Sequence, residues 1–174
     1  RFEKLAALLD GREGRLVAPL PLEMKFRRDR FNEGVLAEWY APGCDDSNWD
    51  KKNTYYTWDQ QDAPEDEKGH DYDGYGWYRS TFEVPADFAG KPVRLWLGGV
   101  LNEGWVWING RYAGHKPHAL WWSGDRELDL DISSLVTPGR PNTLAIRIWN
   151  DAEIGGLYRR GFAYSPVRSE PALD

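Results

Sequence analysis

The feature that most constrains the fold is the segment 98–114, GGVLNEGWVWINGRYAG. Aromatic and β-branched residues alternate in WVWI, which is the side-chain period of a half-buried β-strand. Asn109-Gly110 follows at once, and this pair readily adopts the positive φ angles that a two-residue hairpin turn requires. The segment therefore predicts an antiparallel hairpin with Val106 and Ile108 facing the core.

The same alternation recurs along most of the chain. Strands are expected near residues 22–27, 76–85, 92–99, 127–132 and 142–150, with a closing strand over 155–167. Turns rich in Gly, Pro, Asn and Asp separate them, and hardly any helical spacing is visible. Short alternating strands of this kind are typical of an antiparallel β-sandwich. We therefore predict an all-β fold of two packed sheets.

The length predicts one domain, because 174 residues with 41% hydrophobic content can bury a single core of ordinary size. Residues 1–19 are expected to be an N-terminal arm or connector, with a short helix over 1–10 where apolar residues have helical spacing. The sandwich is predicted over 20–168 and a C-terminal tail over 169–174. Because the chain starts at Arg1, we expect a mature or excised segment of a longer protein.

Charge and cysteine content narrow the possible partners. The formal net charge of -6 is dispersed along the chain, whereas a nucleic-acid-binding protein needs a basic face. No apolar run is long enough to predict a membrane span. Cys44 is the only cysteine, so no internal disulfide can form.

Tryptophan is unusually abundant, with ten residues. Rigid aromatic rings suit the apolar faces of sugars, but a large β-sandwich core uses them too. If the aliphatic residues face the core, the outward face carries tryptophans and arginines together: Trp77, Trp96, Trp105, Trp107, Trp149, Arg79, Arg94 and Arg147. Such a face is either covered by the N-terminal segment and residues 32–62 or is a carbohydrate platform. The need for a cover favours the first interpretation.

A family resemblance emerges from several segments taken in order: YDGYGWYRSTFEVP, LWLGGVLNEGWVWINGRYAGH, DISSL, NTLAIRIWN and GGLYRRG. Together they resemble the galactose-binding-like jelly-roll domain that begins family-two glycoside hydrolases such as β-galactosidases and β-glucuronidases. The resemblance extends from about Leu20 to Pro166. Related jelly rolls accompany other carbohydrate-active enzymes, so the activity of a parent protein does not follow from the domain.

The resemblance implies a jelly roll without its own catalytic machinery, because the catalytic glutamates of these enzymes lie on a separate α/β barrel. The implied partners are an oligo- or polysaccharide and a neighbouring catalytic domain, and the implied setting is extracellular or periplasmic in a bacterium. We therefore expect a non-catalytic carbohydrate-binding or carbohydrate-associated domain of a glycan-degrading enzyme. One alternative is a structural spacer that packs on a catalytic domain. Another is a stand-alone glycan esterase or lyase, against which the missing G-x-S-x-G motif counts.

Two loops of the family's jelly roll lend polar side chains to the active site, and the resemblance transfers this role to matching positions here. These are Asn102 and Glu103, at the entry of the hairpin strand, and Asn150 and Asp151, just before the Gly-Gly pair. The first polar position of the family pattern falls on Leu101, which departs from it. Short amides and carboxylates can hydrogen-bond sugar hydroxyls, although they are also ordinary turn residues.

Loop aromatics are further candidates for sugar contact. Trp121 and Trp122 follow His118 in an irregular stretch, and one of two consecutive rings can face a ligand while the other anchors the loop. Trp58, next to an acidic segment, is a second candidate platform. Arg159 could bind a carboxylated sugar, or it could pack on an aromatic ring instead.

The sequence predicts no cofactor, apart from a possible structural Ca²⁺. Asp71 and Asp73 alternate in GHDYDGYG, and carboxylate and carbonyl oxygens are the ligands that Ca²⁺ prefers. The three histidines and Cys44 do not have the spacing of a zinc site.

Overall fold

The computed structural model of the chain describes residues 14–65, 67–120, 122–124, 126–152 and 154–166. The strands are β1 (Gly14–Pro19), β2 (Glu23–Asp29), β3 (Asp50–Asn53), β4 (Gly74–Glu83), β5 (Arg94–Leu97), β6 (Val100–Leu101), β7 (Glu103–Ile108), β8 (Arg111–Lys116), β9 (Leu128–Asp131), β10 (Pro141–Asn150), β11 (Gly156–Leu157) and β12 (Phe162–Pro166). A short 3₁₀ helix, η1 (Ala86–Phe88), follows β4. The predicted N-terminal helix lies outside the described residues.

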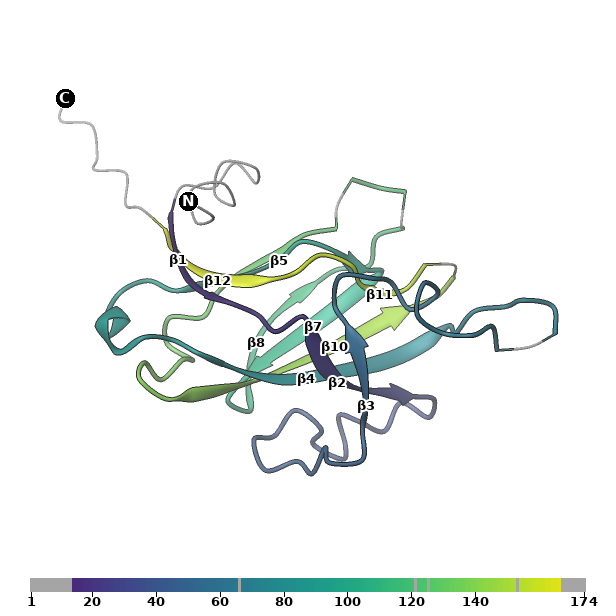
Figure 1. The fold of residues 1–174 in the computed structure, drawn as a ribbon, viewed down its shortest axis with the longest axis horizontal. Helices are drawn as coiled ribbons and strands as arrows, with labels where there is room; N and C mark the ends of the chain where they lie inside the picture. The colour runs from purple at the N-terminus through teal and green to yellow at the C-terminus, as the bar shows by residue number, and fades with distance from the viewer. Residues whose placement is uncertain (1–13, 66, 121, 125, 153, 167–174) are drawn as a thin grey trace.

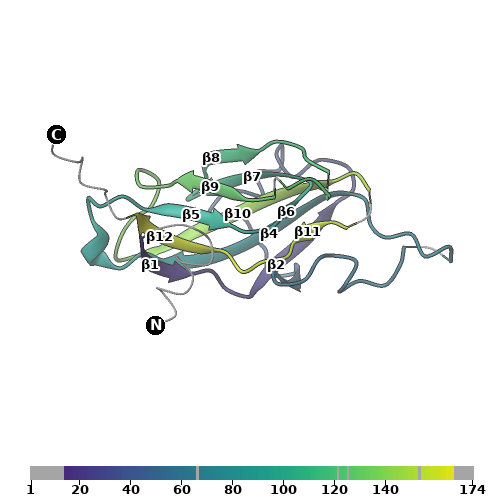
Figure 2. The ribbon, with the colours of Figure 1, turned by 90° about the horizontal axis from the view of Figure 1, so that it is seen from above.

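The strands form two main layers (Figures 1 and 2). The larger sheet has the order β3-β2-β4-β10-β7-β8, and the smaller has the order β1-β12-β5-β9. A two-stranded ladder joins β6 to β11. Every pairing within these sheets is antiparallel. The predicted all-β antiparallel sandwich is therefore confirmed, whereas the jelly-roll connectivity remains a prediction.

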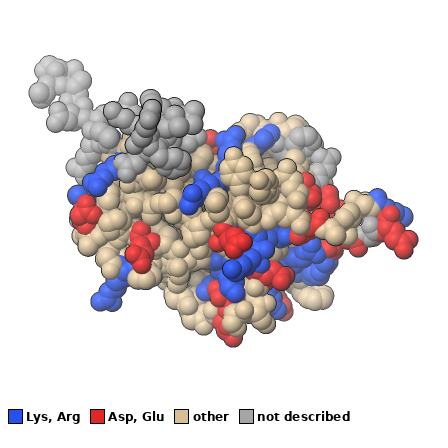
Figure 3. Space-filling model, viewed as in Figure 1, with Lys and Arg blue, Asp and Glu red and all other residues tan. Residues whose placement is uncertain are grey.

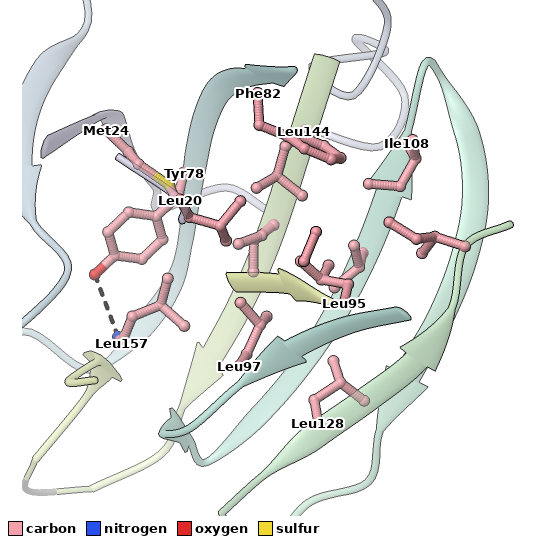
Figure 4. Close-up of a cluster of buried hydrophobic side chains, with 14 of the residues drawn as sticks. Leu20, Met24, Tyr78, Phe82, Leu95, Leu97, Ile108, Leu128, Leu144 and Leu157 are labelled. Carbon is pink, nitrogen blue, oxygen red and sulfur yellow. Dashed lines mark hydrogen bonds between the residues drawn. The ribbon is translucent and has the colours of Figure 1, made fainter. Parts of the chain in front are cut away.

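The core lies between the two sheets, where apolar side chains from both layers meet (Figure 4). On β4, Tyr78 and Phe82 face inward and are buried, as the alternation predicts, and Val84 directly after the strand is buried too. Leu95 and Leu97 of β5 approach them from the smaller sheet. The two faces of each strand are thus fixed by a pattern that is visible in the sequence.

The predicted hairpin is confirmed as β7 and β8. Asn109 and Gly110 have φ angles of 52° and 77°, the left-handed values of a type I′ turn. The Asn109 side-chain amide also donates to Leu135 O at 2.9 Å and to Asn142 Oδ1 at 2.8 Å. Asn109 therefore shapes the turn and ties it to the loop between β9 and β10.

Two predictions about the ends of the sandwich need correction. Residues 14–19, expected within a connecting arm, form β1 and pair with β12 at the edge of the smaller sheet. The predicted closing strand 155–167 is two strands in different sheets, because β11 pairs with β6 whereas β12 pairs with β1 and β5. Residues 158–161, between β11 and β12, belong to neither strand, and the chain passes from one sheet to the other there.

The outward face of the larger sheet is covered by residues 30–49, which we call the covering segment. Its Trp39 and Trp49 are buried in a cluster with Trp77 and Trp107 of the sheet. The Trp39 ring lies edge-on to Trp77 at 6.1 Å, and Tyr40 stacks on Trp107 at 5.3 Å. This part of the predicted aromatic face is therefore covered by a loop, as expected, and is not an open platform.

On the rest of the larger sheet's outward face, an arginine packs against aromatic rings. The Arg147 guanidinium lies 3.8 Å from the Tyr75 ring centroid and 4.8 Å from that of Trp105. Burial lowers the pKa of Arg147, and nearby groups offset only part of this effect. Trp96 was wrongly grouped with this face, because β5 places it on the smaller sheet, where it packs on Phe162 at 4.8 Å.

Candidate functional site

Four connecting segments gather at one end of the sandwich, on the right in Figure 1. They contain the described residues of 54–73, 99–103, 117–127 and 150–158, and we call them the loop end. Backbone hydrogen bonds join them: Trp58 N–H donates to Gly155 O at 2.8 Å, and Asn102 N–H donates to Trp149 O at 2.8 Å. The sandwich therefore holds loops that are far apart in sequence at one place.

An exposed pair of predicted site residues lies at the loop end. His118 Nε2 lies 2.9 Å from an Asp151 side-chain oxygen, and both side chains are 38% exposed. The pair joins the loop after β8 to the loop after β10. It offers solvent an imidazole and a carboxylate, which can donate to and accept from a ligand's hydroxyl groups.

Buried amides support this pair from behind. Asn102 is buried, donates from Nδ2 to Ala119 O at 3.3 Å and accepts the Ala119 N–H at its main-chain oxygen at 3.2 Å. Lys116 Nζ donates to the same Asn102 main-chain oxygen at 2.8 Å. Asn102 Oδ1 is buried and makes no hydrogen bond in the described part of the chain. Asn102 therefore fixes the backbone beside His118.

Asn150 is also buried and bonds a second acidic residue, Asp73. Its Nδ2 donates to Asp73 Oδ1 at 3.0 Å. Burial raises the pKa of Asp73, and the negative charges of Asp151 and Asp71 raise it further. The structure thus places Asp73, predicted as a metal ligand, among the predicted sugar-contacting residues.

The calcium prediction gains no support from this arrangement. Among the residues that the structure describes, no group of three or more His, Cys, Asp or Glu side chains is placed to hold a metal ion. The Asp73 carboxylate already accepts a hydrogen bond from Asn150 Nδ2. Calcium stays a prediction.

Two other predicted residues, Trp58 and Glu103, lie outside this cluster. Trp58 is a core residue whose Nε1–H donates to the Tyr78 hydroxyl at 2.7 Å, so it cannot present a ring face to a ligand. Glu103 lies 2.6 Å from His115, which stacks on Trp105, and so belongs to the outward sheet face. These side chains have structural partners that explain their presence.

Of the remaining candidates, the described Trp122 and Arg159 are exposed. Trp122 is 62% exposed, whereas Trp121 lies outside the described residues. Arg159 is exposed, and its guanidinium lies 5.5 Å from the Tyr158 ring centroid. Ligand contact by Trp122 and Arg159 stays a prediction.

Sequence reasoning missed a group of tyrosines at the loop end. Tyr55, Tyr56 and Tyr158 line a pocket of about 340 Å³ together with Arg126. Tyr55 and Tyr56 are consecutive aromatic residues in a loop, the same pattern that predicts sugar contact at Trp121 and Trp122. Spacing alone did not connect it to Tyr158, which is distant in sequence.

Charged groups on the face seen in Figure 3 are mixed in sign, with basic and acidic side chains side by side around β3 and the projecting loop. Part of this mixture is a network that fastens residues 54–65 to β2. Arg28 donates to Asp62 at 2.9 Å and pairs with Glu65, and Lys52 also pairs with Asp62. None of the described residues forms a helix long and apolar enough to span a bilayer.

Comparisons with known proteins give a consistent assignment. The family model of the beta-galactosidase second all-beta domain matches residues 32–153. Among curated proteins, a Paenibacillus borealis beta-glucuronidase is 29% identical over 72% of this chain and 20% of its own length. The Bacteroides ovatus beta-galactosidase BoGH2A is 31% identical over 70% of this chain and 14% of its own length. The chain therefore spans a fifth or less of these relatives.

Solved structures show the same fold. The apo β-glucuronidase from Ruminococcus gnavus aligns with a TM-score of 0.75 at 20% identity, covering 90% of this chain and 30% of that one. The same enzyme in complex with D-glucuronic acid aligns with a TM-score of 0.73 at 19% identity, covering 86% of this chain and 29% of that one. Together with the match over residues 32–153, this shows that the chain belongs to the all-β sandwich domain family of family-two glycoside hydrolases of the β-galactosidase and β-glucuronidase type.

Proposed function

We propose that the chain is a non-catalytic, carbohydrate-associated domain of a larger glycan-degrading enzyme, and that its loop end lies beside the sugar held by a neighbouring catalytic domain. One observation carries the proposal: the exposed His118 and Asp151 pair, at 2.9 Å, is backed by buried Asn102 and Asn150. Sugar recognition needs donors and acceptors held in fixed directions, and buried amides supply that rigidity.

The relatives narrow the class of sugar. They are named as β-glucuronidases and β-galactosidases, so we propose a β-linked uronide or galactoside as the glycan. In this arrangement Asp151 accepts a hydrogen bond from a sugar hydroxyl while His118 orients the carboxylate. Asp73 and Asn150 limit how far the Asp151 loop can move, because they fix its first residue to the start of β4.

Steady-state kinetics on the full-length protein that carries this chain test the proposal. With aryl β-glucuronide and aryl β-galactoside substrates, we expect Asp151→Asn to raise KM about tenfold for the preferred substrate, the loss of roughly one hydrogen bond to a charged acceptor. His118→Gln should change KM in the same direction. The control is Asp87→Asn, an exposed carboxylate in η1 at the opposite end of β4. Equal KM values for Asp151→Asn and Asp87→Asn would contradict the proposal.

A structural spacer is the second candidate, and a different observation favours it. Phe31 and Leu36 of the covering segment are 86% and 88% exposed, which is unusual for large apolar side chains at neighbouring places in one loop. As a spacer, the chain would bury these two residues against another domain. Phe31→Ser with Leu36→Ser would then lower the melting temperature of the full-length protein but not of the 174-residue chain, and Asp151→Asn would leave KM unchanged.

A further inference from the structure

The tyrosine pocket is a concave site that does not include the His118 and Asp151 pair. Its volume of about 340 Å³ lies within the range of small-molecule pockets in proteins. The residues that matter for recognition come from three loops, and they are Tyr55, Tyr56, Thr57, Gln60, Arg126 and Tyr158. A pocket assembled from loops that the fold holds in place is suited to a ligand.

Aromatic rings form its walls. Tyr55 and Tyr56 are 57% and 48% exposed, and their rings lie nearly perpendicular, at 78° and 5.5 Å. Tyr158 also lines the pocket and lies so close to Gly99 that a Cβ there would be 2.1 Å from the ring. Glycine at position 99 therefore permits this placement of Tyr158. Exposed, fixed rings of this kind offer apolar faces to a sugar ring.

Two polar groups in the lining have unused hydrogen-bonding capacity. Thr57 is only 6% exposed, and its Oγ1 has no hydrogen-bond partner among the residues described. Gln60 accepts the Thr57 N–H at Oε1 at 3.1 Å, which leaves its amide NH₂ group on the other side of the carboxamide. A buried hydroxyl without a partner is costly, and a ligand hydroxyl would remove that cost.

The pocket carries one charged group in its described lining, and that group is positive. Arg126 donates from Nε to Ser123 O at 3.2 Å and from Nη1 to the Tyr158 hydroxyl at 3.4 Å. Within the described ranges, no carboxylate forms an ion pair with it. Its position is held by neutral oxygens, which leaves the guanidinium charge for an anionic ligand.

We infer that the tyrosine pocket binds an acidic sugar residue, a uronate of the glycan. The carboxylate would pair with Arg126, the sugar ring would lie against the tyrosine rings, and ring hydroxyls would bond Thr57 Oγ1 and the Gln60 amide. Arg126 supplies the selectivity, because a neutral hexose has the same ring but no charge. The inference goes beyond the proposed function, since the pocket can bind a uronate whether or not the loop end adjoins a catalytic domain.

Titration of the ¹⁵N-labelled 174-residue chain with methyl β-D-glucuronide and methyl β-D-glucoside tests this inference by NMR. The two probes differ only in a carboxylate replacing a hydroxymethyl group. We expect the glucuronide to bind about tenfold more tightly, the effect of one charge-assisted pair. Shifts should be confined to amides around residues 55–60, 99–101 and 154–158.

Single-residue variants show which side chain causes the preference for the glucuronide. Arg126→Gln should abolish the tenfold preference for the glucuronide. Thr57→Val should weaken the binding of both probes a few-fold and leave that preference unchanged. Arg140→Gln is the matched control, because it removes an exposed arginine just before β10, remote from the pocket lining, and should change neither affinity. Each variant is first compared with the parent chain by thermal melting and amide spectra, and Arg126→Met, which also removes the charge, serves if Arg126→Gln does not fold.

Equal affinity for the two probes, or a preference that survives Arg126→Gln, would overturn the inference. So would the absence of binding by either probe. In that last case, protection of the 55–60 amides in the full-length protein, compared with this chain alone, would identify the pocket as a contact between domains. None of these outcomes depends on the kinetic effect of Asp151→Asn, so this inference and the proposed function can fail separately.

Discussion

At the scale of single residues, one buried carboxylate organises the covering segment. Asp29 accepts hydrogen bonds from Trp77 Nε1–H at 2.9 Å and from the backbone N–H groups of Glu33 and Gly34 at 2.8 and 3.0 Å. Gly34 must be glycine here, because a Cβ would lie 2.4 Å from Trp77 Nε1. Asp29 thus connects the sheet, the tryptophan cluster and the start of the covering segment.

Replacing Asp29 by Ala should therefore destabilise the chain by about 3 kcal/mol, because three donors at a buried site lose their acceptor together. Urea unfolding followed by tryptophan fluorescence measures the change. Glu33→Ala is the control, since its side chain is exposed and only its backbone N–H bonds Asp29; we expect a change within about 0.5 kcal/mol. Similar values for the two variants would contradict this role of Asp29.

A second residue-scale prediction concerns the coupling of carboxylates at the loop end. Burial is the main reason that the pKa of Asp73 is raised, and the charge of Asp151 is the next. Asp151→Asn should therefore lower the pKa of Asp73 toward its ordinary value without reaching it. Carboxyl ¹³C titration by NMR measures this shift. Asp87→Asn, remote from Asp73, should leave its pKa unchanged; an unchanged value in Asp151→Asn would show that the two carboxylates are not coupled.

At the scale of elements, the loop 54–73 depends on its ion-pair network with β2 and β3. Burial would raise the pKa of Asp62, but hydrogen bonds from Lys52 and Arg28 outweigh it and lower the pKa. The hydrogen bond from Arg30 is the main cause that lowers the pKa of Glu65. Lys52 is itself buried, so its charge needs the Asp62 partner.

This network predicts a pH dependence of stability. A carboxyl whose pKa is lower in the folded state stabilises that state above its unfolded pKa, 3.8 for Asp, and this contribution is lost as the pH falls through the folded value. We expect Asp62→Asn to cost about 1–3 kcal/mol at pH 7 and the gap to the parent chain to close below pH 3.8. Urea unfolding at several pH values measures it. A gap that stays constant with pH would contradict the network's role.

Strand positions and the hairpin could be predicted because alternation and Asn109-Gly110 are local signals. The assignment of strands to sheets could not, since it depends on distant partners: Trp96 has the same alternation as Trp77 but lies on the other sheet. Trp58 was misread for a similar reason. Its position in a loop predicted exposure, but the ring packs directly against Gly155 and is buried. A Cβ at position 155 would lie 2.7 Å from the Trp58 ring.

The candidate site was partly predictable. Asn102, Asn150 and Asp151 were found through the family resemblance, and the structure adds that the two amides are buried supports while Asp151 is exposed beside His118. The tyrosine pocket could not be predicted, because its walls come from loops about a hundred residues apart that meet only in the folded sandwich. Spacing along the chain carries no signal for such a meeting.

At the scale of the whole molecule, the sandwich has two unlike ends. One end carries the loop end with its polar pair and tyrosine pocket, and the other carries η1 and the turns that follow β4 and β7. The covering segment closes most of the larger sheet's outward face, so that face is not an open binding platform. Because the polar pair and the tyrosine pocket both lie at the loop end, we expect sugar to bind there.

Hydrogen exchange of the full-length protein that carries this chain, with and without D-glucuronic acid or D-galactose, tests this central claim most directly. With the sugar shown to be bound by inhibition, we predict slower exchange of the amides in 99–103, 117–120 and 150–152, and unchanged exchange in 84–92. Unchanged exchange at the loop end while sugar is bound, or protection only elsewhere in the chain, would contradict the claim.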